Sequence, residues 1–121
     1  MGLHGVERDG VVGVLKAVAE PTRFTVLWAV AQRERSVGEL AELTGAHVAA
    51  VSQHLARLRT AGLVVSRRDG TRVYYRAAGD QVRTLLEDAV QVAEAVAEAE
   101  GEAKPARVRG RAEAERRSVR P

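Results

Sequence analysis

The chain has 121 residues, enough for one domain with a modest hydrophobic core, and with only 3% aromatic residues that core must consist of valine, leucine and alanine. It has no cysteine, which excludes disulfides, thiolate metal sites and thiol redox sensing. The net charge is +3 but uneven: residues 1–100 carry twelve basic and thirteen acidic groups, whereas residues 101–121 carry seven and three. Finding no membrane-spanning stretch and no signal peptide, we expect a cytoplasmic protein.

Residues 1–10 contain three glycines and little helical pattern, so we expect a flexible amino-terminal arm. A small second residue favours removal of the initiator methionine, which leaves Gly2, Leu3 and His4 at the start of the chain. The Gly2 amine, the next two amide nitrogens and the His4 imidazole can then surround a metal ion in a plane. Such a donor set suits Ni(II) or Cu(II) better than Zn(II). The alternative is a disordered tail whose histidine is incidental.

Two helices are expected next, at residues 11–20 and from Pro21 to about residue 33. The first has an apolar side made of Val11, Val14, Leu15 and Val18. In the second, proline suits the first turn, and four residues are expected to face inward: Phe24, Leu27, Trp28 and Ala31.

Residues 36–60 predict a helix, a tight turn and a second helix. Ser36 and Glu39 have the spacing of a capping box, and Gly45 can end the first helix in the left-handed conformation. The second helix runs from about residue 46 to Thr60, with its core face formed by Val48, Val51, Leu55 and Leu58. Its outer face carries Ala49, Ser52, Gln53 and Arg57, which are short or able to bond base edges and phosphates.

A hairpin is expected after Gly62. Residues 63–65 and 73–75 are β-rich, and Asp69-Gly70 between them is a dipeptide favoured by two-residue turns. From His54 to Arg76 there are six arginines and one acid, which suits binding to a phosphate backbone. The predicted fold is therefore mainly α with a small β-hairpin wing, α-α-α-α-β-β-α, a winged helix-turn-helix that places its second helix in the DNA major groove. The expected DNA-binding residues are His47, Ala49, Ser52, Gln53, His54, Arg57, Arg67, Arg68 and Arg72.

The last helix is expected from Asp80 to about Glu98, with a continuous apolar stripe. A stripe this long on so small a domain needs a partner, either a second subunit or the core of the same chain. We favour the second subunit. Residues 101–121 contain few apolar residues and many arginines, so we expect a disordered basic tail that adds salt-sensitive attraction to DNA. The domain proper is thus placed at residues 11–100.

The stretches PTRFTVLWAV, ELAELTG, AAVSQHLARLRTAGLV and RRDGTRVYYR closely resemble the ArsR/SmtB family of bacterial winged-helix regulators. The resemblance covers residues 11–98. It implies a homodimer, paired through its first and last helices, that binds an inverted-repeat operator and responds to a metal ion or another small signal. The dimer-interface residues it implies here are Val11, Leu15, Leu85, Leu86, Ala89, Val92 and Val96.

Two familiar sensing sites of that family are missing. Matched by the apolar stripe, the last-helix metal positions fall at Gly79, Gln81, Val92 and Ala95, none of which is a good ligand. The cysteine site of the family would fall near Val37 and Glu39, and the chain has no cysteine. His4 is our first choice of ligand, joined by Asp80, Glu87 or Asp88 from the last helix. The first residues, GLHGV, resemble the amino terminus of some nickel-cobalt sensors of the family, which favours Ni(II) as cofactor.

We therefore expect a dimeric, sequence-specific transcriptional regulator that responds to nickel. The alternative is a metal-independent regulator controlled by another ligand or by a partner protein. An enzyme is not expected, because we find no nucleophile–base constellation, phosphate loop or paired buried acids.

Overall fold

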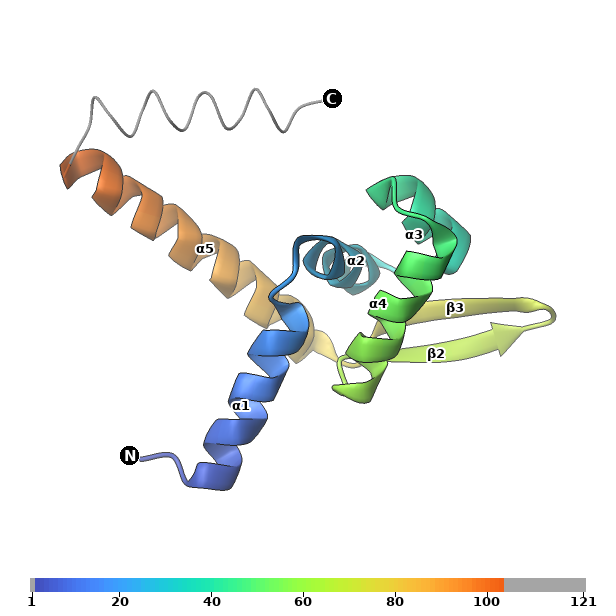
Figure 1. Ribbon diagram of the computed structural model, residues 1–121, viewed down its shortest axis with the longest axis horizontal. Helices are drawn as coiled ribbons and strands as arrows, with labels where there is room; N and C mark the ends of the chain where they lie inside the picture. The colour runs from blue at the N-terminus through green and yellow to red at the C-terminus, as the bar shows by residue number, and fades with distance from the viewer. Residues whose placement is uncertain (1, 104–121) are drawn as a thin grey trace. The chain divides into compact units, whose positions relative to one another are not determined.

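A computed structural model describes residues 2–103 of the chain. Contacts divide the chain into two compact parts, one ending at Thr84 and the other starting at Leu85. The elements, in chain order, are α1 (Gly5–Val18), α2 (Pro21–Gln32), β1 (Arg35–Ser36), α3 (Val37–Thr44), α4 (Val48–Thr60), β2 (Val64–Asp69), β3 (Arg72–Ala77) and α5 (Asp80–Ala103) (Figure 1). The predicted mainly helical, winged helix-turn-helix fold is confirmed, with the two-residue strand β1 as an addition.

Helix α1 begins at Gly5 rather than at Val11, so the expectation of a flexible arm over residues 1–10 is wrong from Gly5 onward. The Arg8 amide donates to the His4 carbonyl (2.9 Å), and Glu7 lies in the first turn, where a negative charge is favourable. An interior glycine costs a helix only about 1 kcal/mol, so Gly10 does not stop α1. None of the residues of α1 is buried.

Of the four residues of α2 predicted to face inward, Leu27 is buried, whereas Phe24, Trp28 and Ala31 are only half-buried. The core face of the helix also includes Val26 and Val30, which are buried. The rings of Phe24 and Trp28 stack with their centroids 6.2 Å apart. Since nearly every residue from Val26 to Ala31 is apolar, periodicity alone could not fix the orientation of this helix.

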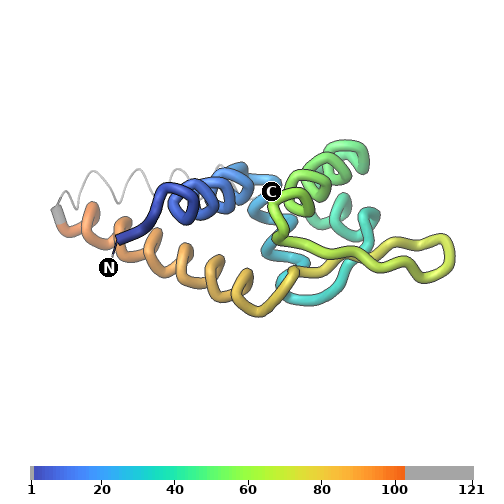
Figure 2. The backbone as a smooth tube through the Cα atoms, turned by 90° about the horizontal axis from the view of Figure 1, so that it is seen from below, coloured from blue at the N-terminus to red at the C-terminus, as the bar shows by residue number. Residues whose placement is uncertain are grey.

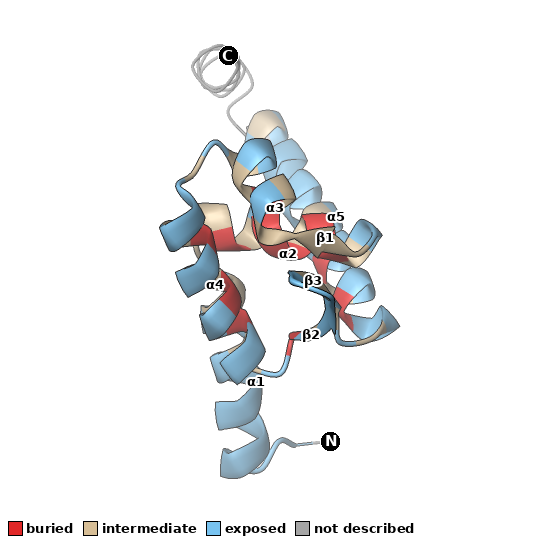
Figure 3. Cartoon of the chain, turned by 90° about the vertical axis from the view of Figure 1, so that its right-hand side faces the viewer, coloured by how far each residue is buried: buried red, intermediate tan, exposed pale blue. Residues whose placement is uncertain are grey.

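The core of the first part lies where α2 packs against α3, α4 and β3. Its fully buried side chains include Val26, Leu27, Leu40, Val51, Leu55, Leu58 and Val64. Valine and leucine thus build the core, as the composition predicts. Figure 3 shows buried residues along one side of α4 and exposed residues along the other.

The sheet has three antiparallel strands in the order β1-β3-β2. Arg35 and Ser36 of β1 pair with Tyr75 and Tyr74 of β3, directly before α3 begins. The short β1 therefore anchors the start of the helix-turn-helix to the β2–β3 hairpin, which we call the wing. In the tube view of Figure 2 the wing extends beyond the helices α3 and α4.

Helix α5 continues past the predicted end at Glu98 to Ala103. Val82 and Leu86 are buried, but every residue from Gln91 to Glu100 is exposed. The basic tail predicted at residues 101–121 starts within this helix, and its remainder lies outside the described residues. Across residues 2–103, no helix is long and apolar enough to span a membrane.

Candidate nucleic-acid interface

Helix α3 begins with the capping box predicted at Ser36 and Glu39. The Glu39 amide donates to Ser36 Oγ (3.2 Å), and the Ser36 amide donates to Glu39 Oε1 (3.0 Å). The bond from the Ser36 amide, aided by Arg33 Nη2 at 3.1 Å from Glu39 Oε2, holds the pKa of Glu39 below its ordinary value. This end of the helix-turn-helix is therefore fixed by local hydrogen bonds.

The turn between α3 and α4 is also set locally. Gly45 ends α3 at φ 71°, the left-handed conformation that favours glycine, and its amide donates to the Ala41 carbonyl (2.9 Å). The Ala46 amide then donates to Thr44 Oγ1 (3.2 Å). These bonds determine the direction in which α4 leaves the turn.

Helix α4 presents the predicted outer face to solvent: Ala49, Ser52, Gln53 and Arg57 are all exposed. On its other side Val51, Leu55 and Leu58 are buried, whereas Val48, predicted to face the core, is 55% exposed because it lies at the helix start. His47 precedes the helix and is exposed, without a capping bond from its side chain. A polar, uncommitted face of this kind can enter a DNA major groove.

His54 does not belong to that outer face. Its Nδ1 lies 3.4 Å from Arg23 Nη1, and its Nε2 lies 3.6 Å from Glu20 Oε2. The expectation that His54 contacts DNA is therefore replaced by a positioning role, in which it ties α4 to α2. Helical spacing explains the difference, since His54 lies between Val51 and Leu58 on the inward side.

The wing turns one residue later than predicted. Asp69 pairs with Arg72, so the two loop residues are Gly70 and Thr71 rather than Asp69 and Gly70. Gly70 has φ 63°, and a two-residue hairpin of the type II′ kind takes glycine at this first position. The position of the turn is therefore set by Gly70, the glycine of the hairpin, which adopts positive φ without strain.

The wing arginines fall into two groups. Arg68 and Arg72 are exposed and make no hydrogen bond or ion pair within residues 2–103. They lie on opposite faces of the hairpin, since Arg68 pairs with Val73 while Arg72 pairs with Asp69 in the alternating register. Both remain candidates for contact with phosphates.

Arg67 is already engaged. Its Nε donates to Glu34 Oε1 (2.9 Å) and Oε2 (2.8 Å), and its Nη2 donates to Glu34 Oε1 (2.6 Å). The guanidinium also lies 4.8 Å from the centroid of the Tyr74 ring. The hydrogen bonds from Arg67 hold the pKa of Glu34 below its ordinary value. Arg67, predicted to bind DNA, thus fastens the wing to the segment before β1.

The predicted metal ligands are not brought together. Among the residues that the structure describes, no group of three or more histidines and acids is placed to hold a metal ion. His4 is the exposed N-cap of α1, and Asp80, Glu87 and Asp88 are exposed on α5. The Gly2, Leu3 and His4 arrangement depends mainly on backbone nitrogens rather than on a cluster of side chains.

The predicted dimer residues differ in availability. Val11, Leu15, Ala89, Val92 and Val96 are exposed, and Leu85 is half-buried. Leu86 is 0% exposed in the single chain, so its assignment to the dimer interface is corrected: it is not available to a partner. The exposed residues of this set form one apolar face on α1 and another on α5.

Sequence patterns missed three charged residues of this region. Arg23 lies in register with Val26, Leu27 and Val30, the spacing of a core-facing helical position, so its burial was detectable. Glu20 caps α2 by accepting from the Arg23 amide (2.7 Å), which lowers the pKa of Glu20. Glu34 gave no local signal, because its partner is 33 residues away in the chain.

Residues 20–66 match a protein family described as "Bacterial regulatory protein, arsR family". Over 84 residues the chain is 54% identical to the HTH-type transcriptional regulator KmtR of Mycobacterium tuberculosis, covering 69% of this chain and 65% of that protein. It thus spans just under two thirds of the length of this relative. It is also 36% identical over 89 residues to the transcriptional activator HlyU of Vibrio cholerae, covering 72% of this chain and 82% of HlyU.

Among solved structures, the fold is similar to the homodimeric winged helix-turn-helix DNA-binding domain Mb0332 from Mycobacterium bovis. The TM-score is 0.69 at 38% sequence identity, and the match covers 77% of this chain and 89% of that domain. The family match at residues 20–66 includes the whole helix-turn-helix and the start of β2.

Proposed function

Because the chain belongs to the ArsR family of bacterial regulatory proteins, we propose that it is a dimeric, sequence-specific DNA-binding regulator of transcription. The outer face of α4 carries this proposal: Ser52, Gln53 and Arg57 are exposed and uncommitted, on a helix whose other side is locked into the core. In this function α4 lies in the major groove, and Arg68 and Arg72 of the wing contact the backbone. The three-stranded sheet holds the wing and α3 in fixed register for this purpose.

The test begins with selection of a binding site from random duplexes, followed by affinity measurements on the selected operator. Gln53→Ala should cost about 1–3 kcal/mol of binding free energy and relax preference at the base it contacts. Gln32→Ala is the matched control, since Gln32 is an exposed glutamine at the end of α2. Absence of any selected sequence, or equal losses in both variants, would contradict the proposal.

We also propose that the regulator responds to Ni(II) held by Gly2, Leu3 and His4 after removal of Met1. Two observations support this finer step. His4 is in an extended conformation directly before α1, and within residues 2–103 no acceptor is bonded to the Leu3 or His4 amide. Neither amide nitrogen therefore donates a hydrogen bond to the helix, and both suit a planar nickel site. In this proposal the bound ion supplies the regulatory signal.

A titration with nickel, monitored by visible absorption, tests this step on protein that begins at Gly2. We expect a square-planar nickel spectrum that disappears in His4→Ala, and we expect Zn(II), which has no d–d band of its own, to displace the nickel poorly. Nickel binding that survives His4→Ala would move the site to carboxylates such as Asp80, Glu87 and Asp88. No nickel binding would leave a regulator controlled by another ligand or a partner protein, with the DNA-binding proposal intact.

A further inference from the structure

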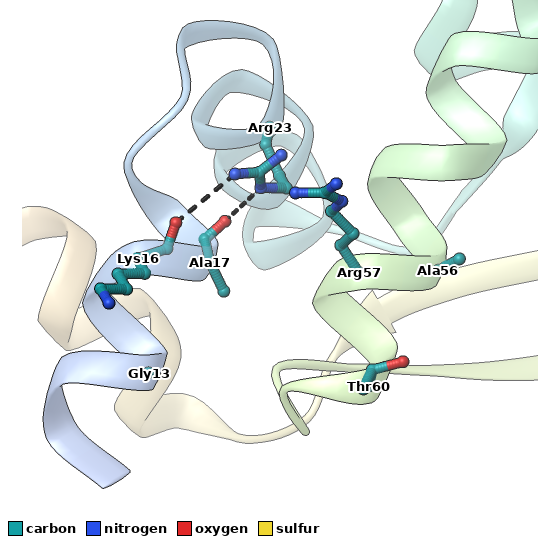
Figure 4. A pocket seen from close by; sticks show the side chains of 7 residues that line it. All are labelled: Gly13, Lys16, Ala17, Arg23, Ala56, Arg57 and Thr60. Atoms are coloured by element: carbon teal, nitrogen blue, oxygen red, sulfur yellow. Dashed lines mark hydrogen bonds between the residues drawn. The ribbon is translucent and has the colours of Figure 1, made fainter. Parts of the chain in front are cut away.

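A basic groove lies beside the outer face of α4. It has a volume of about 430 Å³ and is lined by Gly13, Lys16, Ala17, Arg23, Ala56, Arg57 and Thr60 (Figure 4). These residues come from α1, α2 and α4. Three of the seven are cations and none is an acid, so the groove concentrates positive charge at the border of the proposed DNA-binding face.

Arg23 forms a rigid part of this groove. It is only 8% exposed, and its guanidinium is held by the carbonyls of Lys16 and Ala17 at the end of α1 and by His54 Nδ1. A guanidinium has five N–H donors, and these contacts use three of them. The neighbouring acid, Glu20, accepts from the Arg23 backbone amide and lies 3.6 Å from His54. It makes no salt bridge with the Arg23 guanidinium among the described residues, although, beside that backbone hydrogen bond, the charge of Arg23 helps to lower the pKa of Glu20.

Arg57 supplies a second, uncommitted cation. It is exposed and has no hydrogen bond or ion pair within the described part of the chain. Figure 4 shows the guanidinium ends of Arg23 and Arg57 pointing toward each other. An anion held between two guanidinium groups would accept hydrogen bonds from both.

We propose that this groove binds a phosphate group, and that the phosphate belongs to the DNA backbone beside α4. Guanidinium forks match phosphate oxygens with paired hydrogen bonds. The groove is continuous with the exposed face of α4 through Ala56 and Thr60, which favours a backbone phosphate over a free one. This inference rests on the proposed function only for the source of the phosphate.

Gly13 offers a way to test the groove without touching its arginines. A Cβ added there meets no atom within 4 Å, so a side chain fits. At 100° per residue, Gly13 lies on the opposite side of α1 from Val11 and Leu15, which keeps the proposed dimer face intact. Gly13→Glu places a carboxylate against the groove, Gly13→Gln is its uncharged match, and Gly13→Lys adds a cation.

The first arm measures binding to a random-sequence duplex and to the selected operator at several KCl concentrations. Gly13→Glu should weaken binding by roughly fivefold or more relative to its uncharged match Gly13→Gln, and Gly13→Lys should bind more tightly than Gly13→Gln. Arg57→Ala should reduce the slope of log affinity against log salt by about 0.9, the value for one phosphate. Gly5→Glu, on the same helix but about 12 Å away, controls for net charge and should have little effect.

The second arm titrates inorganic phosphate at constant ionic strength and follows the Arg23 and Arg57 Nε–H resonances. One outcome separates the two claims: phosphate causes saturable shifts that vanish in Gly13→Glu, yet that variant binds the duplex as tightly as wild type. The groove would then bind phosphate, but the claim that this phosphate belongs to DNA would be overturned. Equal duplex binding in all variants and no phosphate shift would overturn the proposal entirely. If wild type binds no duplex, the proposed function fails, and the phosphate arm alone decides the groove.

Discussion

Arg67 connects the wing to the body of the first part through its bonds to Glu34. The fork of hydrogen bonds, 2.6–2.9 Å long, uses both carboxylate oxygens, and Tyr74 covers the guanidinium from one face. Glu34 lies between α2 and β1, next to the strand that pairs with β3. One ion pair therefore reinforces the attachment that β1 makes through its backbone.

The pH dependence of stability should reveal this pair. Arg67 lowers the pKa of Glu34 from the ordinary value of 4.5, so the unfolded chain takes up a proton more readily than the folded one. The stabilisation is present above about pH 4.5 and is lost as the pH falls below it. We expect the free energy of unfolding of Glu34→Gln to lie below that of wild type at neutral pH and to converge with it in acid.

Glu42→Gln is the matched control, because Glu42 is exposed and makes no ion pair within residues 2–103. Chemical unfolding at fixed protein concentration across the acidic range measures both differences. A Glu34→Gln difference that stays constant with pH would show that the ion pair does not contribute as described.

At the level of the elements, the wing divides its arginines between structure and binding. Arg72→Ala should reduce operator affinity and lower the salt slope by about 0.9, because the Arg72 side chain makes no hydrogen bond or ion pair within the described chain. Arg67→Ala should instead leave the slope nearly unchanged and speed amide exchange in β2 and β3, since it releases the wing from Glu34. Salt titrations of both variants decide this. Equal slope changes would mean that Arg67 leaves Glu34 for DNA.

The elements that could be predicted are those whose signals are local. Ser36 and Glu39 specify their helix start within four residues, and Gly45 and Gly70 mark positions where the backbone takes positive φ. The contributions of β1, Arg67 and His54 could not be predicted, because each depends on a partner distant in sequence: Tyr75, Glu34 and Arg23. Local pattern therefore gave the helix-turn-helix and the wing, but not the contacts that hold them together.

At the scale of the whole molecule, α1 and α5 each carry exposed apolar side chains. On α1, Val11 and Leu15 are exposed, and on α5 Val92 and Val96 are 62% and 52% exposed. Burying a valine or leucine is worth about 1.5–3 kcal/mol, so leaving several in water on one small chain is unfavourable. In the proposed dimer a second copy covers these faces and supplies a second α4 for the other half of an inverted repeat.

The double variant Val92→Glu/Val96→Glu should therefore be monomeric in size-exclusion chromatography with light scattering. Both side chains are exposed in the single chain, so the fold should persist and its helical circular dichroism should match wild type. Gln91→Glu, exposed on the same helix, is the control and should remain dimeric. The monomer should bind the selected operator more weakly while retaining affinity for a single half-site, because each α4 still carries its own contacts. A dimeric mass for the double variant would place the interface elsewhere, whereas a monomer that binds the full operator as tightly as wild type would separate DNA recognition from dimerisation.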